Sequence, residues 1–152
     1  MTAVAILAAL LLAGGDAAAS PGGELPVAQP TIELDVAPSI GLADTVEFTL
    51  RVRNDGPHPI ELELPGRPVA FDVVVVGPDG AEVWRRLGDA VSPSILMLLR
   101  LGPGETRDFA ATWAQRDKAG RPVAPGRYTV YAVLPLPTGR LTTARRELVI
   151  NP

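Results

Sequence analysis

Polar and hydrophobic residues alternate along much of the chain after residue 30, with the two-residue period of a half-buried β-strand. The clearest case is TVEFTLRVR, residues 45–53, in which every even-numbered position is apolar and every odd-numbered position is polar. The segment IELEL, residues 60–64, alternates in the same way. We therefore expect both segments to be strands that bury one face and expose the other.

Further strand-like runs follow at similar spacing and are separated by turns rich in glycine and proline. The body of the chain has no apolar stripe of helical period and length, and the prolines that recur between residues 57 and 137 interrupt the candidates. These patterns predict an all-β chain whose seven to eight strands form an immunoglobulin-like antiparallel β-sandwich. The further runs are residues 31–37, 70–76, 81–86, 106–115, 127–135 and 141–150.

Two local patterns predict which strands pair. The tetrapeptide GPDG, residues 77–80, has the composition of a tight turn and predicts a hairpin between the strands that flank it. Valines on both faces of the run before this turn indicate a central strand that is covered on each side. If segments 45–53 and 60–64 also form a hairpin, matching their apolar faces puts Glu61 opposite Arg51 or Arg53.

The motif PGRY, residues 125–128, places a tyrosine at the start of a late strand. This position is typical of the tyrosine corner of immunoglobulin-like domains, and a plain core tyrosine is the alternative. Val130 stands where an antibody domain carries its second cysteine. Because the chain contains no cysteine, apolar packing has to replace a disulfide, and a thiolate metal site and a thiol nucleophile are excluded.

The N-terminal segment differs in composition. Residues 3–13 form an unbroken apolar run, and Ala17-Ala18-Ala19 has the pattern of a signal-peptide cleavage site. We expect a signal peptide over residues 1–19, a Pro- and Gly-rich leader over 20–30 and the sandwich over 31–152. The run is too short to span a bilayer, so the processed chain is predicted to be secreted or periplasmic, without a membrane span. No basic residue precedes the run, and a retained apolar segment is the alternative.

The charge balance argues against a nucleic-acid partner. The chain has a formal charge of −3, which becomes −2 when Asp16 is removed with residues 1–19. A weakly acidic chain does not attract phosphate backbones. The arginine pairs at 85–86 and 145–146 are separated by acidic residues, which is typical of solvated strand faces.

Residues that could carry catalysis or hold a metal are scarce. His58 is the only histidine, and none of the four serines lies in a G-x-S-x-G motif. One histidine cannot build a structural zinc site. Glu61 and Glu63 share a strand face, where pairing with arginine is a simpler interpretation than glycosidase chemistry. We therefore expect no catalytic residues, no metal and no cofactor. The aspartates in loops are interpreted as turn-forming residues; they are Asp55, Asp79, Asp89 and Asp117.

An apolar run without alternation lies between the Trp84 strand and the turn at 103–105. A fully buried strand is one interpretation of this run. The other is that some of its side chains stay exposed and bind a partner protein. Stiff proline-framed loops at 54–59 and 121–126 are further candidates for contact, whereas Trp84 itself is interpreted as core. The candidate partner-binding residues are Ile95, Leu96, Met97, Leu98 and Leu99.

Several of these features resemble one known family. Between Asp44 and Ile150 the chain is similar to the BsuPI-type intracellular proteinase inhibitor domain, an immunoglobulin-like module found in bacteria. The matching features are the strand that ends at Asn54, FDVVV from residue 71, DGAEVWR at 79–85, PGE at 103–105, Trp113, Asp117, Gly120 and PGRY at 125–128.

The resemblance implies a non-enzymatic domain that binds a protein, with a serine protease as the candidate partner. Its implied mechanism is steric, because rigid loops or the 92–100 segment would occupy a protease cleft without being cleaved. The shared residues belong to turns, core and strand starts, so the resemblance assigns no reactive-site residue. The predicted signal peptide would place the target outside the cytoplasm. The alternative is a structural or assembly module of the bacterial envelope that binds proteins or glycans.

Overall fold

The computed structural model describes residues 29–66, 69–88 and 95–152, which form strands joined by turns. A helix long and apolar enough to cross a membrane is absent from these residues. The predicted signal peptide, residues 1–19, lies outside them, as does the leader up to residue 28. The strands are β1 (Thr31–Val36), β2 (Ser39–Gly41), β3 (Val46–Arg53), β4 (Ile60–Pro65), β5 (Asp72–Val76), β6 (Glu82–Arg85), β7 (Leu96–Leu101), β8 (Thr106–Trp113), β9 (Gly126–Leu136), β10 (Gly139–Thr142) and β11 (Arg146–Asn151).

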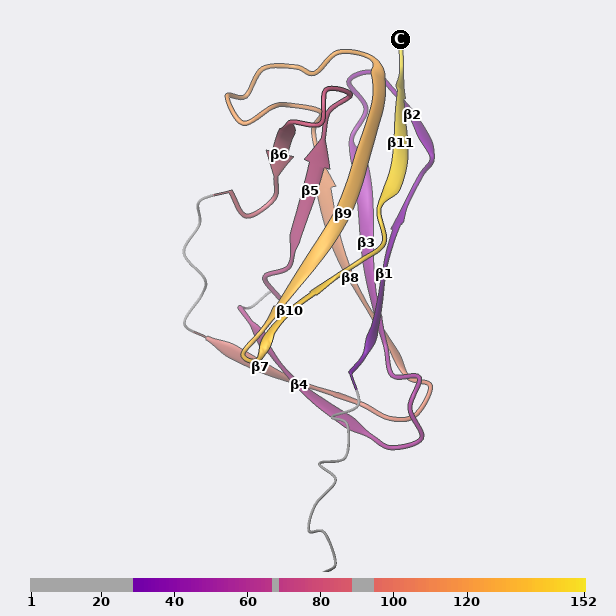
Figure 1. Cartoon of the computed structure of the whole chain (residues 1–152), viewed down its shortest axis with the longest axis vertical. Coiled ribbons are helices and arrows are strands. Elements are labelled where there is room, and N and C mark those ends of the chain that lie inside the picture. Colours follow the sequence, from indigo (N-terminus) through magenta and orange to yellow (C-terminus); the bar gives the residue numbers. More distant parts are fainter. Residues whose placement is uncertain (1–28, 67–68, 89–94) are drawn as a thin grey trace, which may run out of the picture.

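The strands form two facing sheets and a separate two-stranded ribbon (Figure 1). One sheet has the order β1-β3-β8, and the other has the order β2-β11-β9-β5-β6, with β10 paired to β9. The ribbon consists of β4 and β7. Neighbouring strands run antiparallel, except that β2 runs parallel to β11. The predicted all-β, immunoglobulin-like sandwich is confirmed, but the described residues form eleven strands instead of the expected seven to eight.

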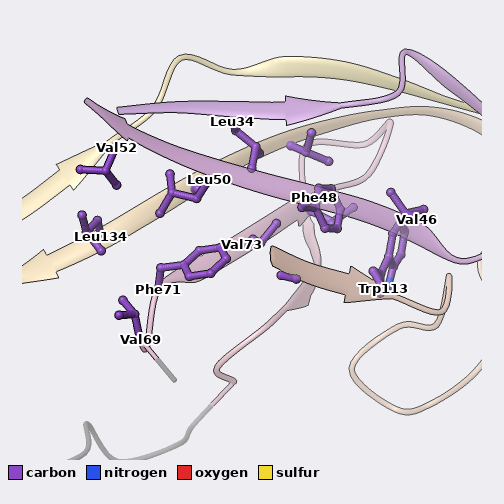
Figure 2. Close-up of a cluster of buried hydrophobic side chains, with 14 of the residues drawn as sticks. Leu34, Val46, Phe48, Leu50, Val52, Val69, Phe71, Val73, Trp113 and Leu134 are labelled. Carbon is purple, nitrogen blue, oxygen red and sulfur yellow. The ribbon is translucent and has the colours of Figure 1, made fainter. Parts of the chain in front are cut away.

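The core fills the space between the two sheets (Figure 2). From β3 the side chains of Phe48 and Leu50 point inward, and from the opposite sheet Val73 and Leu134 meet them; each is at most 1% exposed. This is the alternation read from residues 45–53, because successive side chains on a strand point to opposite faces. Burying a side chain of this size stabilises the fold by about 1.5–3 kcal/mol.

The β5–β6 hairpin forms at GPDG as predicted. The Gly77 amide donates to the Ala81 carbonyl at 2.8 Å, the Asp79 carboxylate accepts from the Ala81 amide at 3.0 Å, and Gly80 adopts a φ of 81°. This φ favours glycine because it has no Cβ. Strand β5 pairs with β9 on one side and β6 on the other, and Val74 is fully buried. The prediction of a central strand is confirmed.

The hairpin considered for segments 45–53 and 60–64, which are β3 and β4, does not form. Both edges of β3 are already paired, one with β1 and the other with β8, so β4 has no free edge to join. Arg51 therefore lies opposite Glu33 and Asp108, and Glu61 lies opposite Arg100 of β7. The register prediction that placed Glu61 opposite Arg51 or Arg53 is wrong, because the cross-strand partners come from strands further along the chain.

Two other differences concern strand boundaries. Strand β2 is not among the expected strands, β7 agrees with the interpretation of the apolar run as a strand, and the run 141–150 is divided between β10 and β11. They separate at Thr143, whose hydroxyl accepts a hydrogen bond from the Ala132 amide at 3.0 Å. At this point a side chain replaces a carbonyl in the ladder, and the register against β9 shifts by one residue.

Asn54 fixes the ribbon to the sandwich. Its side-chain amide donates to the carbonyls of His58 and Leu101 at 2.8 and 3.0 Å, and its oxygen accepts from the Gly56 amide at 2.9 Å. The residue is 1% exposed. A buried amide with all these partners holds the turn after β3 against the end of β7, which sets where the ribbon begins.

Candidate protein-binding site

The ribbon presents the predicted partner-binding residues at the end of the molecule opposite the C terminus (Figure 1). Ile95 is 60% exposed, and Leu96 and Leu98 are each 55% exposed. Met97 is partly buried against the core, and Leu99 is 8% exposed within it. The strand therefore alternates: one face of β7 is core, the other exposes apolar side chains, and the binding of a partner by that face stays a prediction.

The sequence does contain a signal for the alternation in β7, if every second residue from Met97 is taken as an inward position. Met97, Leu99 and Leu101 point inward, whereas Leu96, Leu98 and Arg100 point outward. The apolar outward residues hid this period, because alternation is recognised only when the outer positions are polar. We call Ile95, Leu96 and Leu98 the apolar row.

An acidic row lies beside the apolar row on the outer face of the ribbon. Glu61 and Glu63 of β4 point outward, and Glu63 lies directly opposite Leu98. Glu61 forms an ion pair with Arg100. Among the described residues, no ion pair involves Glu63. The ribbon therefore offers a partner hydrophobic contacts on one strand and negative charge on the other.

A groove adjoins these rows. It has a volume of about 450 Å³ and lies between the outer face of the ribbon and the turn that joins β9 to β10. The residues that line it come from the ribbon, from the end of β9 and the turn after it, and from the segment before β1, and include Glu63, Leu98, Leu136, Pro137, Gln29 and Pro30. Strands β4 and β9 are distant in the sequence, so local patterns gave no signal for this groove.

The loop 114–125, between β8 and β9, is a second exposed surface and lies beside β6 (Figure 1). The Asp117 carboxylate accepts hydrogen bonds from the amides of Ala119 and Arg121, each at 2.9 Å, and pairs with the Arg121 guanidinium at 2.8 Å. These interactions, with the Arg121 amide foremost, lower the pKa of Asp117. The tip of the loop is therefore held in one shape although it is exposed.

This loop is fastened to β6. The Lys118 amide donates to the Val83 carbonyl at 3.0 Å, and the Lys118 ammonium lies 2.7 Å from the Glu82 carboxylate. The hydrogen bond from Lys118 lowers the pKa of Glu82. The loop thus covers part of an edge that no described strand pairs. A cavity of about 630 Å³, bordered by Pro78 and Pro122, separates the loop from the β5–β6 turn.

Aromatic residues support the base of the same loop. Trp84 stacks on the buried Trp113 with ring centroids 5.8 Å apart, and Trp113 meets Tyr128 edge-on at 6.1 Å. The Tyr128 hydroxyl donates to the Ala124 carbonyl at 2.6 Å, which is the bond that defines a tyrosine corner. The position of Trp84 against the core favours the core interpretation over a partner-facing one.

The residues considered for catalysis and metal binding are dispersed. His58 lies exposed in the turn before β4. Within the described ranges, no three His, Asp or Glu side chains come together in a way that could hold a metal ion. Asp55 pairs with Arg53 at 2.8 Å, and Asp79 and Asp117 bond to their own turns. Asp89 lies outside the described residues.

Comparison with known proteins identifies one family. The family model described as "BsuPI: Intracellular proteinase inhibitor" matches residues 32–138, which is more than half of the chain. The match includes most of the motifs that carried the resemblance in the sequence. A search of curated protein sequences found no significant match.

Solved structures match the chain only at low sequence identity and with TM-scores below 0.5. The alkylpurine DNA glycosylase AlkC of Pseudomonas fluorescens is 22% identical, with a TM-score of 0.44 over 80% of this chain and 31% of that one. The CARDB domain of the PF1109 protein of Pyrococcus furiosus is 16% identical, with a TM-score of 0.41 over 85% and 95% of the two chains. A Bacteroides uniformis β-glucuronidase is 17% identical, with a TM-score of 0.41 over 78% and 13%. Such low values carry no information on ligands or activity.

The prediction of a secreted or periplasmic protein is wrong, because the matching family is described as intracellular. That prediction depended on the composition of residues 1–19, which lie outside the described residues. An apolar run followed by small residues is a signal from composition alone. On the match over residues 32–138, the chain belongs to the BsuPI family, which is described as an intracellular proteinase inhibitor.

Proposed function

We propose that the chain is a non-enzymatic inhibitor that binds a serine protease and blocks its cleft sterically without being cleaved. Membership of a proteinase inhibitor family supports a protease as the partner. The observation that carries the mechanism is the exposure of the apolar row on a strand whose inner face is anchored in the core. Exposed apolar side chains that gather on one face are typical of protein-binding surfaces.

The backbone of β7 is held in an extended form before any partner arrives. It pairs with β4 from Leu96 to Leu101, and the inward side chains of Leu99 and Leu101 are buried. No described strand pairs with its other edge. An extended strand with an open edge can form main-chain hydrogen bonds with a partner. Because β7 is already ordered, binding costs little conformational entropy.

The same anchoring opposes cleavage. To enter an active site as a substrate, β7 would have to separate from β4 and withdraw Leu101, which is fully buried, from the core. Removing a buried leucine from its surroundings costs about 2–5 kcal/mol. In the loop 114–125, Arg121 pairs with Asp117 and Lys118 pairs with Glu82 of β6, so fewer charged groups are left for a partner.

An inhibition assay tests the proposed function. The full chain is titrated into subtilisin-like, chymotrypsin-like and trypsin-like serine proteases, with hydrolysis of a chromogenic substrate as the readout. We expect inhibition of at least one class, and mass spectrometry should show an uncleaved chain after incubation. No inhibition across the panel contradicts the proposal, and cleavage within β7 contradicts the steric mechanism.

A pair of variants tests the proposed surface. Leu98→Gln removes apolar contact at the centre of the ribbon and should weaken inhibition by about tenfold. Leu42→Gln is the matched control, because Leu42 is 42% exposed and follows β2 at the other end of the sandwich. It should inhibit like the wild type. Equal inhibition by both variants contradicts a role for the apolar row.

A further inference from the structure

The groove beside the ribbon combines apolar walls with charge of one sign. Leu62, Leu98, Leu136 and Pro137 supply apolar surface. The charged residues that line it, within the described part of the chain, are Glu61 and Glu63, and no basic residue does so. Its volume is about 450 Å³.

We infer that the groove and the two rows bind a basic amphipathic protein segment, whose apolar side chains contact Leu98 and the groove while a lysine or arginine pairs with Glu63. The spacing supports this assignment, because Glu63 and Leu98 are directly opposite each other across the ribbon. Side chains in that position lie about 4.5–5.5 Å apart at Cβ. A segment that contacts Leu98 therefore brings its neighbouring side chains within reach of Glu63.

Charge complementarity selects a basic partner over a neutral one. Glu61 is already paired with Arg100, whereas no ion pair of Glu63 is found among the described residues. A cation placed at Glu63 thus gains an ion pair without displacing one that the structure shows. Because this surface is exposed, the interaction contributes more to selectivity and to the rate of association than to affinity.

The segment is expected to belong to the target protease, and to that extent the inference rests on the proposed function. Recognition of a basic amphipathic segment is nevertheless a property of the ribbon and the groove, and it does not depend on the rest of a protease. It can be measured with a synthetic peptide in the absence of any protease.

A binding experiment with the full chain tests the inference. Fluorescein-labelled short peptides of alternating leucine and lysine, leucine and glutamate, or serine and lysine are titrated with the protein, and fluorescence anisotropy is recorded at several salt concentrations. The leucine–lysine peptide should bind more tightly than either of the others, since it alone satisfies both rows. Its affinity should fall as salt rises.

Charge reversal identifies the binding residue. Glu63→Lys should weaken binding of the leucine–lysine peptide by about three- to tenfold, which is the effect expected of an exposed ion pair and its reversal. Glu47 is exposed near the start of β3, at the end of that strand far from the ribbon. Glu47→Lys is the control, because it makes the same change in net charge. It should bind like the wild type. Circular dichroism spectra verify that both variants are folded.

Three results would overturn the inference: equal binding of all three peptides, equal weakening by the two variants, or dimerisation of the chain that Leu98→Gln abolishes. The last result would assign the apolar row to a second copy of the chain. Peptide selectivity without protease inhibition refutes the proposed function and leaves the groove assignment intact. Inhibition without peptide selectivity refutes the groove assignment and leaves the proposed function intact.

Discussion

Tyr128 and Asn54 show how single side chains complete a fold that the strand ladders leave unfinished. Both are buried, and both donate to carbonyls in turns that belong to no sheet. Backbone groups at strand ends have no ladder partner, and leaving them unpaired inside the protein costs about 1–3 kcal/mol each. These residues therefore stabilise the two ends of the sandwich: Tyr128 holds the loop 114–125, and Asn54 holds the ribbon.

Tyr128→Phe removes the hydroxyl and leaves the ring in place. We expect the free energy of unfolding to fall by about 1 kcal/mol, because the hydrogen bond to the Ala124 carbonyl is lost. Urea denaturation followed by circular dichroism measures the change. Tyr131→Phe is the control, since no hydrogen bond from the Tyr131 hydroxyl is found in the described part of the chain. A similar loss in both variants would mean that the tyrosine corner contributes nothing specific.

At the scale of elements, exposed edges are covered in different ways. The edge of β6 is shielded by the loop 114–125 through the Lys118 amide and the ion pair between Lys118 and Glu82. The edge of β7 has no described strand beside it and carries the apolar row. Natural sheets protect their edges against unwanted pairing. An open edge next to an apolar outer face is consistent with the proposed role of β7 in binding a partner.

The attachment of the loop 114–125 to β6 should depend on pH. The pKa of Glu82 is lowered in the folded state, so its ionised form stabilises the fold above the ordinary value of 4.5, and this contribution is lost as the pH falls through the lowered pKa. Glu82→Gln should therefore reduce stability by about 0.5–1 kcal/mol at neutral pH, the range for a partly exposed ion pair. The difference from the wild type should vanish in acid.

Denaturation of the wild type and of Glu82→Gln across the acidic range measures this dependence. Asp72 acts in the opposite direction, because burial raises the pKa of its carboxyl, and its ionisation destabilises the fold as the pH rises. Asp72 is present in both proteins, so its effect largely cancels in the comparison. A stability difference that persists below the lowered pKa of Glu82 would contradict the assigned role of the ion pair.

At the scale of the whole molecule, the sheets and the ribbon share one core. Leu62 and Leu101 of the ribbon belong to the same cluster of buried residues as Phe48 and Val73 of the two sheets. Elements that bury side chains in a common core unfold together, as small domains commonly do. The ribbon is thus a rigid part of the sandwich and not an appended arm.

This shared core predicts one cooperative unfolding transition. Tryptophan fluorescence reports on the stacked Trp84 and Trp113 near the loop 114–125, and far-ultraviolet circular dichroism reports on all strands. The two signals should give the same midpoint in urea. Leu101→Ala, in the ribbon, should lower both midpoints equally, with a loss of about 2–5 kcal/mol. Separate midpoints would show that the ribbon unfolds independently.

The sequence by itself determined the features that depend on neighbouring residues. Alternation in β3 and β4, the GPDG turn, the central position of β5 and the tyrosine corner all follow from side-chain direction and turn chemistry, which act over a few residues. The family resemblance, confirmed over residues 32–138, adds the protease partner class. The location predicted from the composition of residues 1–19 is wrong, because the matching family is described as intracellular.

Only the tertiary structure decided which strands pair and which apolar side chains stay exposed. Strand β4 pairs with β7 because β1 and β8 already occupy both edges of β3. Competition of this kind for edges is a property of the whole chain. The same pairing separates Leu99, in the core, from Leu98, at the surface, and places Leu98 directly opposite Glu63. Long-range pairing therefore created the candidate site, whose residues are scattered along the sequence.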